Sequence, residues 1–117
     1  MAEDKPTLPP QLQEQLMRLQ QLQQTLRSVL TQRQQLEMEL SETEKALSEL
    51  ERSTDDAVIY KSVGSILVKS PRQGVMDELK EHRDILKTRV DVLMRQEKRS
   101  REKIDEMQKR LQEMLKH

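Results

Sequence analysis

The chain has 117 residues, with 21 Lys and Arg against 21 Asp and Glu, one Tyr, and no Cys, Phe or Trp. The near absence of aromatic side chains disfavours an ordinary globular core, because aromatics supply much of the buried area of such cores. The absence of Cys excludes disulfides and Cys-based metal sites, and no apolar run is long enough for a transmembrane helix. The remaining composition, rich in Leu, Gln, Glu, Lys and Arg, is typical of long helices and coiled coils.

The N-terminal region is predicted to lie outside the regular structure. Residues 1–10 contain Pro6, Pro9 and Pro10, three of the four prolines of the chain, and are expected to form a flexible segment. The paired prolines suit the start of a helix, where a missing N–H costs nothing. These residues also lack the apolar core of a secretory signal, which favours a cytoplasmic protein.

Residues 11–56 are predicted to form the first of two coiled-coil helices. The segment has neither Pro nor Gly, and Ser53 to Asp56 are expected to end it. With Leu12 at heptad position a, nine of the thirteen a and d positions are apolar. Such a stripe indicates a helix that packs along one face against another helix. The apolar members are Leu12, Leu19, Leu22, Leu26, Val29, Leu36, Leu40, Leu47 and Leu50.

Residues 57–69 are predicted to form a β-hairpin. Two short runs of β-branched and other apolar residues, 58–60 and 66–68, flank a segment whose Gly64 suits a tight turn. An irregular loop between two helices is the alternative, but a loop has no need of six large apolar side chains.

Residues 70–117 are predicted to form the second coiled-coil helix. Ser70, Pro71, Arg72 and Gln73 have the spacing of a capping box with proline at the first helical position. With Met76 at position a, nine of the twelve a and d positions are apolar: Met76, Leu79, Leu86, Val90, Leu93, Ile104, Met107, Leu111 and Met114. The expected fold is therefore mainly α, an antiparallel two-helix coiled coil whose helices are joined by a β-hairpin.

The predicted hairpin cannot cover itself. Both of its faces carry apolar side chains, both of its edges are open, and two isolated strands are marginal in water. We therefore expect hairpins from several chains to combine into an intersubunit sheet or barrel. The candidate oligomerisation residues are Val58, Ile59, Tyr60, Val63, Gly64, Ile66, Leu67 and Val68. Ile85 and Val92, which lie off the helical stripe, are candidates for further subunit contacts, although scattered surface apolar residues are normal.

The segment from Asp55 to Lys69, placed between two coiled-coil helices, resembles the hairpin of the archaeal β-type prefoldin subunits. The stretch Ile59-Tyr-Lys-Ser-Val-Gly64 carries most of this resemblance, and Arg95-Gln-Glu-Lys98 in the second helix extends it. A single hairpin favours the β type over the α type, which would have two. The resemblance implies an ATP-independent co-chaperone without a cofactor, in a hexamer of two α-type and four β-type subunits built on a double β-barrel. It further implies capture of unfolded client proteins at the coiled-coil tips and their transfer to a group II chaperonin.

Apolar residues gather where the first helix begins and the second ends. A flexible Leu and Met surface can bind many apolar sequences weakly, which suits capture of unfolded chains. Alternatively, Leu16 and Leu115 only widen the seam near frayed ends. The candidate client-binding residues are Leu8, Leu12, Leu16, Met17, Leu19, Leu111, Met114 and Leu115.

Other functional signals are weak. The basic stretch 95–103 is interleaved with Glu and lacks aromatics, so it favours a solvated helix face over a nucleic-acid site. His82 and His117 are far apart, and Ser62, Ser65 and Ser70 have no histidine partner in a recognisable arrangement, so neither a metal site nor catalysis is expected. The alternative function is a structural coiled-coil scaffold or tether without chaperone activity.

Overall fold

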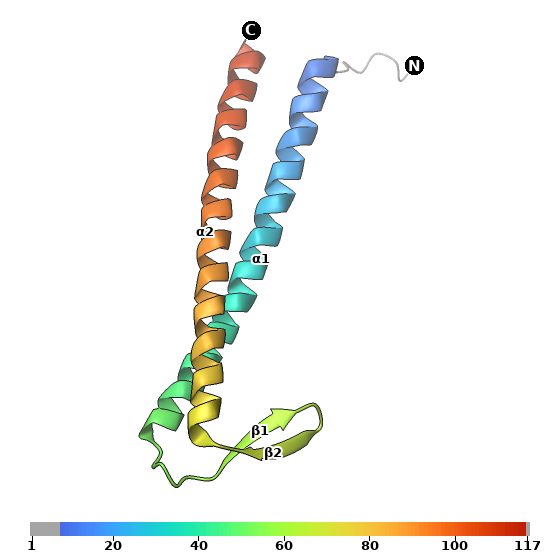
Figure 1. Ribbon diagram of the computed structural model, residues 1–117. Helices are drawn as coiled ribbons and strands as arrows, with labels where there is room; N and C mark the ends of the chain where they lie inside the picture. The colour runs from blue at the N-terminus through green and yellow to red at the C-terminus, as the bar shows by residue number, and fades with distance from the viewer. Residues whose placement is uncertain (1–7, 117) are drawn as a thin grey trace. The chain divides into compact units, whose positions relative to one another are not determined.

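The computed structural model describes residues 8–116 and consists of two long helices with a two-stranded hairpin between them in sequence (Figure 1). The elements are α1 (Pro10–Arg52), β1 (Ile59–Val63), β2 (Ile66–Ser70) and α2 (Arg72–Lys116). The predicted mainly α fold, with two helices joined by a β-hairpin, is confirmed; the barrel between subunits stays a prediction. Most of the N-terminal segment expected to be flexible, residues 1–7, lies outside the described residues, as does His117.

Helix α1 ends at Arg52, four residues before the predicted boundary at residue 56. The backbone N–H and the hydroxyl of Ser53 both bond to the carbonyl oxygen of Leu50, at 3.2 and 2.6 Å. A tight turn follows, in which the backbone N–H of Ala57 bonds to the carbonyl oxygen of Thr54 at 3.0 Å. The Thr54 hydroxyl also donates to the Asp56 carboxylate, and this bond holds the pKa of that carboxyl below its usual value. Local polar side chains thus offer the backbone an alternative to further helix.

Helix α2 begins at Arg72, and the predicted capping box is wrong. Ser70 is the last residue of β2, and its hydroxyl donates to the carbonyl oxygen of Val68 at 3.2 Å. The Gln73 side chain instead donates to Asp77, one turn further along, at 2.9 Å. The first helical hydrogen bond runs from the N–H of Val75 to the carbonyl oxygen of Pro71 at 3.1 Å. The carbonyl that accepts this first bond belongs to Pro71, so Pro71 and not Ser70 occupies the N-cap position.

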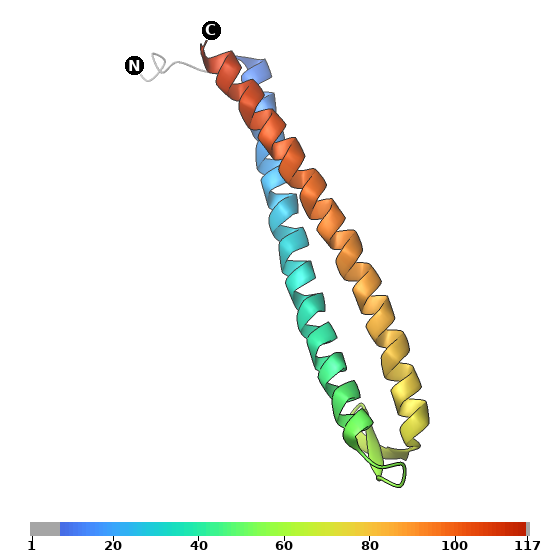
Figure 2. The same ribbon diagram turned by 90° about the vertical axis from the view of Figure 1, so that its left-hand side faces the viewer.

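The described residues form two compact units. The helix-end unit contains residues 8–32 and 93–116, in which the start of α1 and the end of α2 run antiparallel and side by side (Figures 1 and 2). Leu12, Val29 and Leu111 are its buried apolar residues. The start of α1 and the end of α2 therefore lie at the same end of this unit (Figure 1).

The hairpin unit contains residues 33–92, and its core lies between the end of α1 and the start of α2. Leu86 is the most buried large side chain, only 1% exposed, and Leu47, Met76 and Val90 are also buried. Thr43 is buried as well, and its hydroxyl is satisfied by the carbonyl oxygen of Glu39 at 2.9 Å. A polar residue therefore occupies the core without leaving an unpaired group.

The heptad assignment made from the sequence is correct. In both helices every a and d position is buried or half-buried except Thr54, which follows the end of α1, and Met114, in the last turn of α2. In α1 four of the six neighbouring e positions are half-buried as well, at Leu16, Gln23, Leu30 and Glu37. The buried face of α1 is therefore wider than an a and d seam alone. Neither helix has a segment long and apolar enough to cross a membrane, within residues 8–116.

Candidate functional site

The hairpin is closed by a two-residue turn at Gly64 and Ser65. Gly64 has φ of 59°, and no other described residue has a positive φ. A positive φ at only the first central position is the pattern of a type II′ turn, which glycine adopts without strain. The strands pair antiparallel in the register Ile59 to Ser70 through Val63 to Ile66. This register determines which side chains share a face of the sheet.

Apolar side chains stand on both faces of the hairpin. One face carries Ile59, Val63, Ile66 and Val68 with Lys61, and the other carries Tyr60 and Leu67. Leu67 is 70% exposed, and every other large apolar side chain here except Ile59 is also exposed. We call the exposed set the hairpin patch; its members are Val58, Tyr60, Val63, Ile66, Leu67 and Val68. Exposed apolar groups on both faces of a two-stranded sheet make the hairpin patch a candidate surface for contact with another chain.

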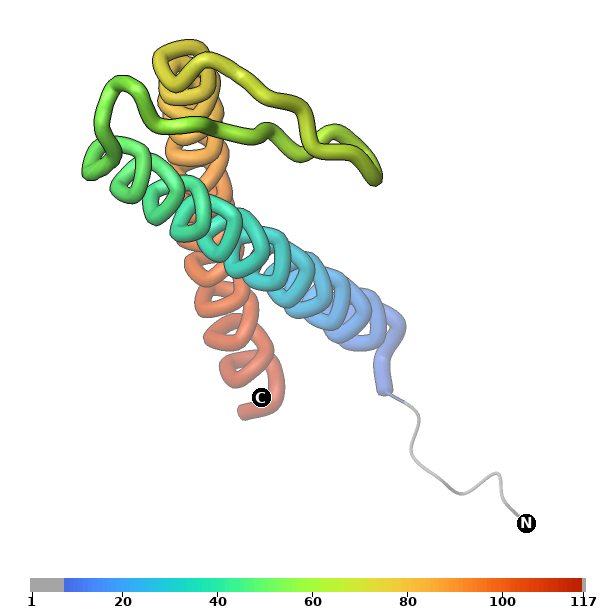
Figure 3. The backbone as a smooth tube through the Cα atoms, turned by 90° about the horizontal axis from the view of Figure 1, so that it is seen from below, coloured from blue at the N-terminus to red at the C-terminus, as the bar shows by residue number. Residues whose placement is uncertain are grey.

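One ion pair links the middle of the hairpin to helix α2. The ammonium group of Lys61 in β1 lies 2.6 Å from the Glu78 carboxylate in α2. The turn end extends away from the start of α2, with no helix of the hairpin unit against it (Figure 3). With this single ion pair and a free turn end, the hairpin patch stays accessible to another chain.

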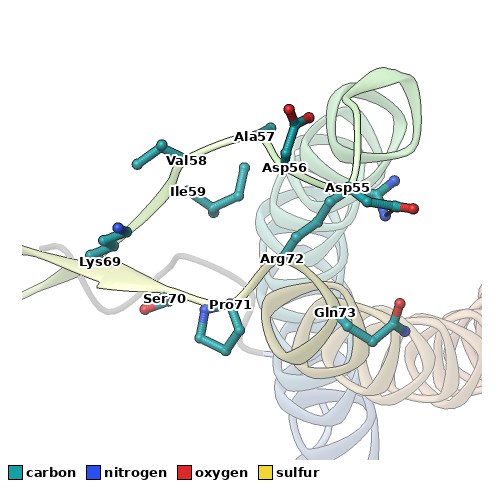
Figure 4. A pocket seen from close by; sticks show the side chains of 10 residues that line it. All are labelled: Asp55, Asp56, Ala57, Val58, Ile59, Lys69, Ser70, Pro71, Arg72 and Gln73. Atoms are coloured by element: carbon teal, nitrogen blue, oxygen red, sulfur yellow. Dashed lines mark hydrogen bonds and ion pairs between the residues drawn. The ribbon is translucent and has the colours of Figure 1, made fainter.

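Arg72 anchors the junction where the hairpin meets the helices. Its Nε and Nη2 donate to the carbonyl oxygen of Leu50 at 3.1 and 2.8 Å, and its Nε also bonds to the Ser53 hydroxyl at 3.0 Å. Its Nη1 lies 3.1 Å from Asp55, in the loop before β1. Figure 4 shows Arg72 between this loop and the start of α2, beside a hollow lined by Val58, Ile59, Lys69 and Pro71. The arginine therefore ties both ends of the hairpin segment to the end of α1.

The candidate client-binding residues divide into two groups by burial. Leu12 and Leu111 are buried in the seam of the helix-end unit, and Leu16 and Leu19 are half-buried beside it. The remaining four are exposed, Met17 to 62% and Leu115 to 68%. We call these four the tip patch: Leu8, Met17, Met114 and Leu115. The half-buried state of Leu16 agrees with the alternative that it widens the seam.

Two further features lie at the surface of the hairpin unit. Ile85 and Val92, both at position c of α2, are exposed on one face of the hairpin unit. Glu39 of α1 and His82 of α2 lie 2.9 Å apart, joining the two helices of the same unit at its surface.

The structural contacts of Arg72, Lys61 and the Glu39–His82 pair are not predictable from the sequence. Their partners are 17 or more positions away along the chain, so no local spacing could have identified them.

Comparisons with known proteins agree with this geometry. The model of a family described as prefoldin subunit matches residues 13–117. The chain is 46% identical over 108 residues to prefoldin subunit beta of Archaeoglobus fulgidus, with 92% of this chain and 93% of the relative covered. It is 44% identical over 108 residues to prefoldin subunit beta of Pyrococcus furiosus, with 92% of each chain covered.

The crystal structure of the prefoldin beta subunit from Thermococcus strain KS-1 superimposes with a TM-score of 0.87 at 41% identity, covering 97% of this chain and 99% of that one. The chain belongs to the prefoldin family. The resemblance found in the hairpin sequence is thereby confirmed. Membership of the prefoldin family implies a co-chaperone role and assembly with other prefoldin subunits.

Proposed function

We propose that this chain is a β-type prefoldin subunit that acts as an ATP-independent holdase in the cytoplasm. It captures unfolded proteins at the tip patch and passes them to a group II chaperonin. It works in a hexamer of two α-type and four β-type subunits, without a cofactor or catalytic step. The observation that carries the proposal is that Leu12 and Leu111 are buried in the seam while Leu8, Met17, Met114 and Leu115 stay exposed in the same helix-end unit.

The hairpin patch supports the oligomeric part of the proposal. Its six apolar side chains are exposed in the single chain, and burying a large apolar side chain contributes about 1.5–3 kcal/mol. Strand pairing between chains would satisfy the open edges and cover both faces at once. Ile85 and Val92 then contact a neighbouring subunit beside the barrel, because no part of their own hairpin unit covers them.

The tip patch supports the capture part of the proposal. Unfolded proteins have exposed apolar area in common, and Met and Leu side chains adapt to many apolar sequences. A single patch of four side chains binds weakly, which permits release to a chaperonin. Several patches on one assembly then gain avidity by holding one client at several points.

The experiment that tests this function compares two double variants of the full-length, assembled protein. Met17→Gln with Leu115→Gln makes the tip patch polar without touching the seam, and Gln keeps the side-chain length and helix propensity. Met38→Gln with Met94→Gln is the matched control, because both of these Met residues are exposed but lie outside the tip patch. The readout is suppression of aggregation of a chemically denatured enzyme in the absence of nucleotide.

We expect the tip variant to lose most of its suppression and the control to keep it, with equal oligomer mass for both. Equal suppression by both variants would overturn the assignment of the tip patch. A wild-type assembly with no suppression at all would favour the structural scaffold, which needs coiled-coil pairing alone.

A further inference from the structure

Methionine is the one sulfur-containing residue type of this chain, which has seven Met and no Cys. Among the six Met in residues 8–116, Met76 is buried, Met107 is half-buried, and Met17, Met38, Met94 and Met114 are exposed. Two of the exposed four, Met17 and Met114, make up half of the tip patch. Oxidation of accessible sulfur therefore acts directly on the surface proposed to hold the client.

We propose that Met17 and Met114 are a modification site for hydrogen peroxide, and that their oxidation to the sulfoxide switches off client capture. This inference rests on the function proposed above and adds its regulation. The two residues differ from the seam Met residues in accessibility, because the thioether of Met76 is shielded in the core of the hairpin unit at 6% exposure. Peroxide thus reaches the tip patch before it reaches the packing that holds the helices together.

The chemistry needs no group beyond the thioether and the peroxide. A lone pair on Sδ attacks one peroxide oxygen, so that an S–O bond forms while the O–O bond breaks. The leaving hydroxide takes up the proton of the transferred OH group, and the products are the sulfoxide and water. The sulfur is oxidised by two electrons and the peroxide is reduced by two, and methionine sulfoxide reductases reverse the change.

Oxidation makes the Met side chains of the tip patch polar and so weakens client binding. A sulfoxide is polar and no longer favours contact with apolar client segments, which weakens each tip patch by about tenfold. Because capture depends on several tip patches at once, the loss of affinity at each patch multiplies across the assembly. The helices themselves persist, since neither residue is buried in the seam.

The test treats the full-length, assembled protein with hydrogen peroxide. Peptide mass mapping measures sulfoxide at each Met, circular dichroism measures helix content, and aggregation of a chemically denatured enzyme measures capture. Two variants are compared with the wild type: Met17→Leu with Met114→Leu, which removes the tip sulfurs and keeps the apolar surface, and Met38→Leu with Met94→Leu as the matched control.

We expect treated wild type and treated control variant to need at least about tenfold more protein for the same suppression, with unchanged helix content. The tip variant should stay within about twofold of its untreated activity, and sulfoxide reductase should restore the wild type. If wild type that carries sulfoxide at Met17 and Met114 still captures client as well as before treatment, this inference is overturned but the proposed function is not. An equal loss of capture in the treated tip variant has the same consequence. Oxidation of Met76 ahead of Met17 would overturn it too. Failure of the untreated wild type to suppress aggregation would instead overturn the proposed function, and this inference with it.

Discussion

Arg72 donates to the backbone carbonyl oxygen of Leu50 from both Nε and Nη2, at 3.1 and 2.8 Å, across 22 positions of the sequence. The carbonyl lies in the last turn of α1, where backbone acceptors have no partner within the helix. A cation at the C-terminal end of a helix is also favoured by the helix dipole. This one contact joins the end of α1 to the start of α2 and so holds the base of the hairpin.

Arg72→Ala is expected to lower the free energy of unfolding by about 2 kcal/mol, because a largely buried donor to the Leu50 carbonyl and the Ser53 hydroxyl is lost. Arg72→Lys should recover roughly half of this loss, since one ammonium cannot reproduce the planar fork. Urea unfolding at one fixed protein concentration measures both variants. Arg52→Ala, which removes an exposed side chain of the same turn, is the control and should change stability by less than about 0.5 kcal/mol. A loss in Arg72→Ala no larger than in this control would contradict the role of the contact.

The two glycines of the chain are expected to respond to alanine with opposite signs. Gly64→Ala forces a side chain into positive φ and should cost about 1–2 kcal/mol, although a Cβ there has open space around it. Gly74→Ala lies within α2, where its Cβ would contact Pro71 Cγ at 3.5 Å, an ordinary distance. This second change should stabilise the protein by about 0.5–1 kcal/mol. Thermal unfolding of both variants provides the comparison, and destabilisation by both would show that Gly74 has a further role.

The neighbouring residues Ile85 and Leu86 should separate assembly from folding. Leu86→Ala opens a cavity at a site only 1% exposed and should cost about 3 kcal/mol in unfolding free energy. Ile85→Ala removes an exposed side chain, so the stability of the isolated chain should change by less than about 0.5 kcal/mol. Its expected effect is weaker association, measured by the concentration dependence of the oligomer mass. If the Ile85 variant assembles as tightly as the wild type, that residue makes no contact between subunits.

The face of the hairpin that carries Tyr60 and Leu67 should be required for assembly. Replacing both with Ser removes exposed apolar area without touching the helical seam, so the helix content should be preserved while the oligomer dissociates. Light scattering after size exclusion measures the mass, and circular dichroism measures the helix. Met38→Ser is the matched control, since this side chain is 66% exposed on α1 away from the hairpin. An oligomer of unchanged mass in the double variant would place the interface elsewhere.

Prediction from the sequence succeeded where the determining interaction is periodic or local. The heptad phase identified the buried positions, including Leu86 and Val90, because a helix presents every third and fourth residue to one partner. Gly64 located the turn, since a two-residue hairpin loop demands a positive φ that other residues avoid. The continuous apolar runs 58–60 and 66–68 likewise indicated strands with two apolar faces, because successive side chains of a strand point to opposite faces.

Prediction from the sequence was wrong or incomplete where two structural roles compete for one residue. Ser70 matches a capping box, but β2 extends to this residue and its hydroxyl bonds to the backbone of its own strand. Leu12 and Leu111 are candidate client-binding residues by their position near the helix ends, but both are buried in the helical seam; their role in client binding stays a prediction. Position along the chain had grouped them with Leu8 and Leu115, whereas direction around the helix separates them.

The sequence by itself determined the two helices, their apolar stripes and the hairpin between them, because each of these depends on residues a few positions apart. Only the tertiary structure decided that Arg72 donates hydrogen bonds to the end of α1 and that Lys61 pairs with Glu78. It also decided that four apolar side chains near the helix ends stay exposed. The physical reason is that such contacts depend on how the helix ends and the hairpin are oriented in space. That orientation is set by packing over the whole of a unit and not by any local pattern of residues.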